Sequence, residues 1–157
     1  MDLKELFEPD DVVLRFDPVD KWDAIETLVG RLVDRGLVSE EQKNEVLDAV
    51  LGRERSMSTG MERGIAMPHA AVDGIDKVVA QLGIVTREDG LAFESIDAQP
   101  ARLVVLLVIP RAQKLLHIRT LADLARVLQS DVVRMALQEA ATPEEAWNAL
   151  VEGQPAK

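Results

Sequence analysis

The longest apolar stretch of the chain is Leu103-Val104-Val105-Leu106-Leu107-Val108-Ile109, and Pro110 closes it. Its short length and its valine and isoleucine content favour a buried β-strand over a helix. The stretch falls far short of the ~20 apolar residues that a helix needs to cross a bilayer. We therefore expect residues 103–109 to form a buried strand inside a protein core.

Strands and helices alternate on either side of this stretch. Further strands are expected at residues 77–86 and 65–67, and residues 12–16 are expected to form an edge strand or an extended entry segment. Apolar residues recur with helical spacing in five other segments: residues 22–33, 46–51, 115–128, 133–137 and 146–150. Helix-capping residues precede four of these segments: Asp20, Ser39, Ser130 and Thr142. This alternation predicts an α/β layered domain.

Length and composition narrow the class of protein. The chain has 157 residues, of which 47% are hydrophobic, enough for one compact domain spanning residues 1–157. The formal net charge of -10 disfavours nucleic acid as a partner, because binding phosphates needs clustered Lys and Arg. Cysteine is absent, which excludes disulfides and thiolate chemistry. The N-terminus lacks the features of a signal peptide, so we expect a soluble, cytoplasmic protein without membrane insertion.

One of the chain's two histidines, His69, ends the stretch Gly64-Ile65-Ala66-Met67-Pro68-His69. Imidazole is the only side chain that, unperturbed, titrates between about pH 5 and 8, so His69 can be a nucleophile, a base or a ligand. Gly60 and Gly64 allow tight turns that bring backbone N–H groups near an anion, and Ser58 and Thr59 add hydroxyl donors. The segment is therefore typical of an anion-binding loop beside a nucleophilic histidine. A histidine that is hydrogen-bonded only for structure is the alternative.

Two further residues are candidates for the same site. Arg53 follows a helical segment, and its planar guanidinium suits an oxyanion; an ordinary cation at a helix end is the alternative. His117 lies near the start of the helix at residues 115–128, where it could donate to a phosphate on His69 or orient that ring. Because Leu115 and Ile118 flank His117, a core histidine is the alternative. Nothing in the spacing shows that the two rings meet.

Other chemistries fit the sequence less well. Glu62 and Asp73 could join the histidines in a metal site, but the spacing matches no known ligand motif, so neither a metal nor a cofactor is expected. No nucleophile elbow occurs, so a hydrolase is not expected. Arg55 and Arg63 are expected at the rim of the site, and Glu54 is a candidate salt-bridge partner for another segment.

Residues 51–60, Leu-Gly-Arg-Glu-Arg-Ser-Met-Ser-Thr-Gly, together with residues 64–69, resemble a known signature. It belongs to the enzyme IIA component, type 2, of the bacterial phosphoenolpyruvate-dependent phosphotransferase system, the fructose/mannitol and nitrogen-regulatory class. Residues 117–128 are similar to that family's second conserved helix and its histidine. The resemblance covers nearly the whole chain and implies a mixed β-sheet flanked by helices on both faces. Residues 111–114, Arg-Ala-Gln-Lys, depart from the Gly- and acid-rich loop usual in the family.

The resemblance implies that His69 takes a phosphoryl group from the phosphohistidine of a small phosphocarrier protein. His69 would pass it to a IIB component or use it as a regulatory signal. Arg53 and His117 match the family's phosphate-stabilising arginine and second histidine, and Ser58 and Thr59 match its hydroxyl-bearing loop. Because the chain contains no IIB or IIC domain, we expect the nitrogen-regulatory type. The alternative is a non-catalytic module whose affinity for a transporter or kinase depends on phosphorylation.

Transfer between imidazoles sets further requirements on His69. A neutral ring nitrogen must be exposed for attack, and positioning and charge stabilisation supply most of the catalysis. We expect the other ring nitrogen to bond a backbone carbonyl, which would fix the tautomer. Apolar neighbours such as Ile65 and Met67 are expected to keep water away from a phosphoimidazole.

Overall fold

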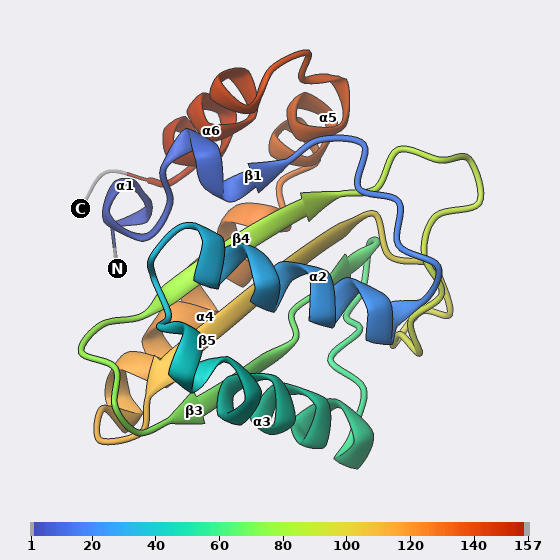
Figure 1. Ribbon diagram of the computed structural model, residues 1–157. Coiled ribbons are helices and arrows are strands. Elements are labelled where there is room, and N and C mark those ends of the chain that lie inside the picture. Colours follow the sequence, from blue (N-terminus) through green and yellow to red (C-terminus); the bar gives the residue numbers. More distant parts are fainter. Residues whose placement is uncertain (1, 156–157) are drawn as a thin grey trace.

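The computed structural model describes residues 2–155, except for the side chain of Lys114. Within these residues the chain forms one α/β domain around a mixed sheet of five strands (Figure 1). The strands are β1 (Val12–Val13), β2 (Ile65–Ala66), β3 (His69–Val72), β4 (Val79–Ile84) and β5 (Leu103–Pro110). The sheet order is β1-β4-β5-β2, and β3 pairs with a later part of β5. The β4–β5 pair is antiparallel and the other pairs are parallel, so the predicted mixed sheet is confirmed.

Helices cover both faces of this sheet, as predicted. One face carries α2 (Lys21–Asp34) and α3 (Lys43–Ser56), the latter preceded by the 3-10 turn η2 (Glu40–Gln42). The other face carries α4 (Lys114–Leu128), α5 (Asp131–Glu139), α6 (Pro143–Glu152) and the short α1 (Leu3–Leu6). A 3-10 turn, η1 (Pro9–Asp11), leads into β1. Figure 1 shows α2 and α3 in front of the strands and α4 behind them.

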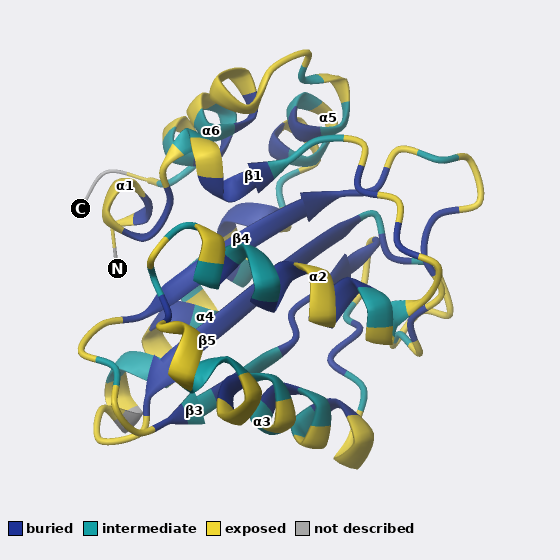
Figure 2. Ribbon diagram, viewed as in Figure 1, coloured by how far each residue is buried: buried dark blue, intermediate teal, exposed yellow. Residues whose placement is uncertain are grey.

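The strand β5 explains why its sequence is apolar without interruption. Alternate side chains enter two different cores: Leu103, Val105, Leu107 and Ile109 pack with α4 to α6, and Val104, Leu106 and Val108 pack with α2 and α3. Every residue of β4 and β5 is buried, and both strands lie in the middle of the buried region in Figure 2. A strand covered on both faces needs apolar residues at every position, so the predicted buried strand at residues 103–109 is confirmed.

The four predicted helix caps are all present. The side chains of Asp20, Ser130 and Thr142 accept hydrogen bonds from backbone N–H groups in the first turns of α2, α5 and α6. Ser39 accepts from the Gln42 N–H at 3.2 Å, but it caps η2, which then leads into α3. Each cap satisfies donors that the helix itself leaves free, which is why these helix starts are readable from the sequence.

The edge strand predicted at residues 12–16 is shorter in the structure. β1 covers Val12–Val13, and Arg15 has a φ of 50°, in the left-handed region, so the chain turns out of the extended conformation there. The Phe16 N–H then returns to the sheet and donates to the Ile84 carbonyl at 2.8 Å. The prediction was right about the edge but too long, because a β-branched run does not reveal that the chain turns at Leu14 and Arg15.

The apolar stripe of α4 also differs from the prediction. Leu115 and Ile118 are 78% and 67% exposed, whereas Thr120 and Leu124 are buried. The Thr120 hydroxyl donates to the Leu116 carbonyl at 2.7 Å, so a polar side chain is accommodated on the buried face. The predicted stripe therefore mixed two faces of the helix, and the first turns of α4 present apolar side chains to solvent.

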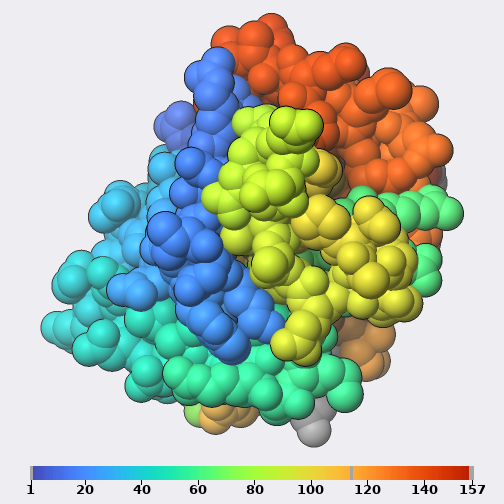
Figure 3. All heavy atoms as spheres, turned by 90° about the vertical axis from the view of Figure 1, so that its right-hand side faces the viewer, coloured from blue at the N-terminus to red at the C-terminus, as the bar shows by residue number. Residues whose placement is uncertain are grey.

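The long connection between β4 and β5 folds over one end of the sheet. Arg87 of this connection pairs with Asp17 at 2.5 Å and donates to the Pro18 carbonyl at 2.7 Å, which fastens it to the segment after β1. Figure 3 shows this connection, in yellow-green to yellow, lying between the blue N-terminal segment and the orange to red C-terminal helices. It therefore closes the end of the sheet at which β4 finishes and β5 begins.

Candidate active site

His69 is the first residue of β3, at the edge of the sheet where β2 and β3 follow one another along β5. β2 pairs with the start of β5, and β3 pairs with its later part, with His69 opposite Leu107. Pro68 separates the two strands; its carbonyl accepts from the Leu107 N–H at 3.0 Å. Because proline has no N–H, the backbone leaves the regular ladder just before His69. The histidine thus begins a strand at a break in the sheet edge, half-buried.

The imidazole of His69 is held by one backbone hydrogen bond. Its Nδ1 lies 2.8 Å from the Met67 carbonyl oxygen. A carbonyl can only accept, so Nδ1 carries the proton and donates, and Nε2 keeps its lone pair. The sequence prediction of a carbonyl that fixes the tautomer is confirmed, and Met67 is the residue that supplies it. Nε2 is therefore the ring nitrogen available for chemistry.

The structure brings the second histidine next to the first. His117 lies in the first turns of α4, and its ring centroid is 5.3 Å from that of His69 with the ring planes inclined by 73°. His117 is partly exposed and is not enclosed in the core. The segments that carry the two rings are far apart in sequence, so only the packing of α4 beside β3 makes them neighbours.

The pKa values of both imidazoles are lowered, which favours the neutral rings. Burial is the largest cause for His69, and the hydrogen bond to Met67 and the charge of Glu54 act in the opposite direction. The charge of Arg53, and that of His117 when it is protonated, lower the pKa of His69 further. Burial also lowers the pKa of His117, with Arg53 as the second cause. Arg53 lies in the last turn of α3, as predicted, and its Nη1 donates to the Met57 carbonyl at 2.7 Å. One guanidinium thus acts electrostatically on both rings.

A cavity of about 420 Å³ opens beside His69. Its walls are Arg53, Ser58, Thr59, Gly60, Met61, Met67, His69, Ile96, Leu121, Ala122 and Ala125. The α4 side of the cavity is entirely apolar, and Met67 lines it as predicted. Ile65, by contrast, is buried in the core on the α4 face and does not line the cavity. One side of the cavity thus carries the Arg53 cation and the loop of Ser58, Thr59 and Gly60, and the other side is an apolar wall that limits access of water.

The loop after α3 folds back as a small hairpin against the segment before His69. Met67 N–H donates to the Thr59 carbonyl at 3.1 Å, and Met61 N–H donates to the Ile65 carbonyl at 2.7 Å. Gly64, with a φ of 76°, makes the turn of this hairpin and does not line the cavity. Gly60 does line it; a Cβ there would lie 2.4 Å from the Glu94 carbonyl oxygen. The two glycines thus shape the loop by conformation and close packing.

The hydroxyls of Ser58 and Thr59 are already engaged. Thr59 Oγ1 donates to the Glu54 carboxylate at 2.6 Å, and Ser58 Oγ lies 2.5 Å from the Glu94 carbonyl and 3.3 Å from Glu54. Glu54 is buried and pairs with Lys21 of α2 at 3.3 Å, so the predicted salt bridge to another segment is confirmed. Sequence reasoning did not foresee that Glu54 would organise the loop. A signal was present, since a carboxylate four residues before a Ser-Thr pair is within reach of their N–H and O–H groups.

The remaining charged candidates lie away from the cavity. Arg63 donates to the Gln129 carbonyl at 3.1 Å, and Arg55 lies 6.0 Å from the ring of Trp22. Asp73, which follows β3, pairs with Arg111 at 2.8 Å on the surface, so it contacts the segment at residues 111–114. Within residues 2–155, no three His, Asp or Glu side chains gather closely enough to hold a metal ion.

Comparison with known proteins identifies the class to which this fold and site belong. The family model described as "Phosphoenolpyruvate-dependent sugar phosphotransferase system, EIIA 2" matches residues 5–153, so the chain belongs to this family of phosphoryl-transfer domains. Among the described residues, no helix combines the length and the apolar character needed to cross a membrane.

Relatives fall into a sugar-specific and a nitrogen-regulatory group. The chain is 33% identical over 135 residues to the PTS system fructose-specific EIIA component of Haloferax volcanii, covering 86% of this chain and 85% of the relative. It is 34% identical over 113 residues to the nitrogen regulatory protein of Escherichia coli, covering 70% and 68%. The fold matches enzyme IIA-mannitol of E. coli, solved in complex with phosphorylated enzyme IIB-mannitol, with a TM-score of 0.77, 23% identity and coverage of 93% and 97%.

Proposed function

We propose that the protein is a phosphoryl carrier in which Nε2 of His69 accepts a phosphoryl group from the phosphohistidine of a phosphocarrier protein and passes it on. The observation that carries this proposal is the hydrogen bond from Nδ1 of His69 to the Met67 carbonyl, 2.8 Å long, which leaves Nε2 unprotonated beside the cavity. Membership of the EIIA 2 family supports the same reaction. A reaction that begins from phosphoenolpyruvate places the protein in the cytoplasm.

In the acceptance step, the lone pair of Nε2 attacks phosphorus while the N–P bond of the donor breaks. The electron pair of the broken bond stays on the donor imidazole, and the proton on Nδ1 of His69 stays in place. Positive charge then develops on the His69 ring, and the Met67 carbonyl dipole stabilises it. The onward step reverses these roles, with His69 as the leaving group. No general base is needed in the acceptance step, because the attacking Nε2 is unprotonated.

The transferred phosphoryl group is negatively charged, so cations and hydrogen-bond donors around it would stabilise it. Arg53 and His117 are the two groups that we assign to this task, because both act on the His69 ring and Arg53 lines the cavity. Ser58 and Thr59, with Gly60, form the loop on the other side of the same cavity. The apolar α4 wall of Leu121, Ala122 and Ala125 limits hydrolysis by excluding water.

The next acceptor is either a IIB component or a regulatory target, and we propose the nitrogen-regulatory use. The 34% identity to the E. coli nitrogen regulatory protein supports this choice, and the 33% identity to the H. volcanii fructose component supports a sugar-specific role. The structure of enzyme IIA-mannitol with phosphorylated IIB-mannitol makes a IIB component the natural alternative acceptor. Transfer of label from the phosphorylated protein to purified IIB components decides between them: efficient transfer would overturn the purely regulatory assignment.

A labelling experiment tests the carrier proposal itself. The protein is incubated with labelled phosphoenolpyruvate, the first enzyme of the system and the phosphocarrier. We expect one acid-labile phosphoryl group, located on His69 by mass spectrometry. His69→Ala should take up no label, whereas His117→Ala, which removes the other imidazole of the same pair, should still be labelled. Uptake by His69→Ala at the wild-type level would show that the carrier residue is elsewhere.

A further inference from the structure

A buried carboxylate lies directly behind the candidate active site. Glu54 is only 2% exposed, and both of its oxygens accept from the Thr59 N–H at 3.1 Å. Thr59 Oγ1 donates to it as well, at 2.6 Å, and Lys21 Nζ lies 3.3 Å away. Ser58 Oγ lies 3.3 Å from the carboxylate, but its single proton is directed to the Glu94 carbonyl at 2.5 Å. The carboxylate therefore holds Thr59 through both its N–H and its hydroxyl.

The position of Glu54 is electrostatically unfavourable by itself. It lies in the last turn of α3, where the partial negative charge of the helix end opposes an acidic side chain. Burial adds a desolvation cost that only close partners offset. Lys21 supplies the charge, and its ammonium group in turn lies 4.8 Å from the ring of Trp22 and 5.6 Å from that of Phe93. Hydrogen bonds from the Thr59 N–H and hydroxyl and an ion pair with Lys21 keep the carboxylate in this place, which indicates that the geometry of the loop is important.

A continuous chain of hydrogen bonds connects this carboxylate to the reactive ring. Glu54 accepts from the Thr59 N–H, the Thr59 carbonyl accepts from the Met67 N–H at 3.1 Å, and the Met67 carbonyl accepts from His69 Nδ1 at 2.8 Å. The N–H and the carbonyl of one residue belong to different peptide units, so the link is mechanical and runs through the backbone of Thr59 and Met67. By holding Thr59 in place, Glu54 sets the position of Met67 and hence of the carbonyl that bonds the His69 ring.

We propose that Glu54, neutralised by Lys21, is a positioning residue that fixes the orientation and tautomer of His69 through Thr59 and Met67. Only the catalytic consequence of this inference rests on the proposed function. The effect of Glu54 on the orientation and tautomer of the His69 ring does not depend on it. Glu54 does not line the cavity, so it acts through the loop. Its neighbour Arg53 extends the other way and does line the cavity, so one helix end supplies both the support and the cation.

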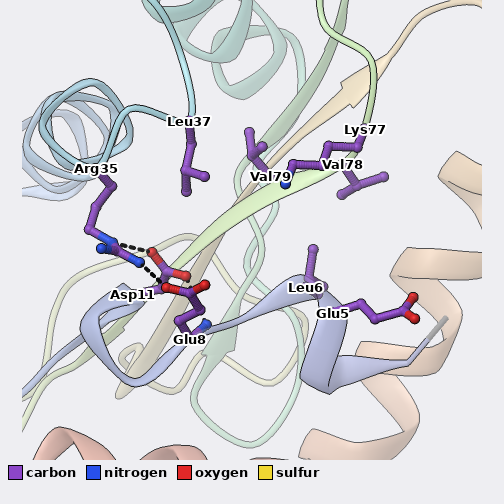
Figure 4. A pocket seen from close by; sticks show the side chains of 9 residues that line it. All are labelled: Glu5, Leu6, Glu8, Asp11, Arg35, Leu37, Lys77, Val78 and Val79. Carbon is purple, nitrogen blue, oxygen red and sulfur yellow. Dashed lines mark hydrogen bonds and ion pairs between the residues drawn. The ribbon is translucent and has the colours of Figure 1, made fainter.

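The chain offers a closely matched control for this test. Asp11 is also a buried carboxylate, 3% exposed, and it accepts from Arg35 Nε at 2.9 Å and from Gln81 Nε2 at 2.7 Å. It precedes β1, at the edge of the sheet opposite to β3. Figure 4 shows Asp11 and Glu8 bonded to Arg35 beside a separate cavity of about 190 Å³. Glu54→Gln and Asp11→Asn therefore make the same chemical change, one behind His69 and one far from it.

The primary measurement is the tautomer of His69 in the unphosphorylated protein, read from nitrogen-15 NMR shifts at a pH where the ring is neutral. In the wild type and in Asp11→Asn we expect the proton on Nδ1. In Glu54→Gln we expect a mixture, because an amide cannot accept all the donors that the carboxylate holds. The rate constant for acceptance from the phosphocarrier should fall by up to ~100-fold with little change in KM, as for a misplaced reacting group.

A second pair of variants keeps the test decisive if Glu54→Gln does not fold. Thr59→Val removes the hydroxyl bond to Glu54 and should shift the tautomer in the same direction but less, and Thr59→Ser should restore wild-type behaviour. If Glu54→Gln and Thr59→Val keep the wild-type tautomer and rate, or if Asp11→Asn loses as much rate as Glu54→Gln, the positioning role is wrong. If the wild type takes no label on His69, the carrier function is wrong, while the tautomer comparison still decides the positioning role.

Discussion

The rings of His69 and His117 meet edge to face, with centroids 5.3 Å apart and planes inclined by 73°. One ring is fixed by a backbone carbonyl at the sheet edge and the other is carried by the first turns of α4. His69 and Arg53 line the same cavity, and the ring of His117 lies beside that of His69. The pair thus combines a rigid nucleophile with a second imidazole on a separate element.

This arrangement predicts unequal effects of His117→Ala on the two transfer steps. Acceptance depends mainly on Nε2 of His69, whereas a loaded dianion depends on neighbouring donors until it leaves. We expect onward transfer to slow more than acceptance, by about tenfold or more, a typical loss for one positioned proton donor. Rapid-quench measurement of each half-reaction checks this, with His117→Gln as a variant that keeps a donor. Equal loss in both steps would assign His117 a structural role.

The lowered pKa of His69 predicts a dependence of stability on pH. In the unfolded chain this imidazole titrates near its ordinary value of about 6.5, and in the folded protein it titrates lower, chiefly because it is buried. As the pH falls below about 6.5 the unfolded state binds the proton first, so stability is lost until the folded pKa is passed. Urea unfolding between pH 8 and pH 5 should show a smaller loss in His69→Asn than in the wild type. A steeper loss in the variant would contradict the pKa direction.

Arg53 acts on both rings, so its replacement should be visible in both. Because its positive charge lowers the pKa of His69 and of His117, Arg53→Gln should raise both pKa values towards the ordinary one. Arg53→Lys, which keeps the charge, should leave them low. Acceptance should slow by about 100-fold in Arg53→Gln, the typical loss when one charge-stabilising donor is removed. NMR titration of the two imidazoles provides the measurement; unchanged pKa values in Arg53→Gln would show that the guanidinium is screened from the rings.

The exposed apolar residues of α4 are predicted to serve a partner and not the fold. Replacing Leu115 and Ile118 by Gln should change the free energy of unfolding by less than about 0.5 kcal/mol, because both side chains are mostly in solvent. Binding of the phosphocarrier should weaken by about 1 kcal/mol for each change, measured by calorimetry. Leu124→Ala, in the buried face of the same helix, should instead cost about 2 to 5 kcal/mol of stability. A large loss of stability in the Gln variants would refute the assignment.

The difference between Leu115 and Leu124 also shows where sequence analysis stops. Both residues belong to the same apolar pattern, and the pattern correctly predicted a helix. Which side of the helix is buried, however, depends on how α4 lies across β5. Thr120, whose hydroxyl donates to the Leu116 carbonyl, occupies a buried position that a purely apolar stripe would have filled. For β1, the turn at Arg15 shortens a strand that the β-branched run alone extends to residue 16.

The sequence by itself determined the alternation of strands and helices, the helix caps, the buried strand at residues 103–109 and the segment that carries His69. These features depend on neighbours within a few residues: side-chain periodicity, a cap and the donors it satisfies, and a proline that interrupts a ladder. Only the tertiary structure decided that His117 meets His69, and that Glu54 reaches the same ring through Thr59 and Met67. The first relation joins segments far apart along the chain and follows from how α4 packs beside β3. The second depends on how the loop after α3 folds back against the segment before His69, which side-chain periodicity does not encode.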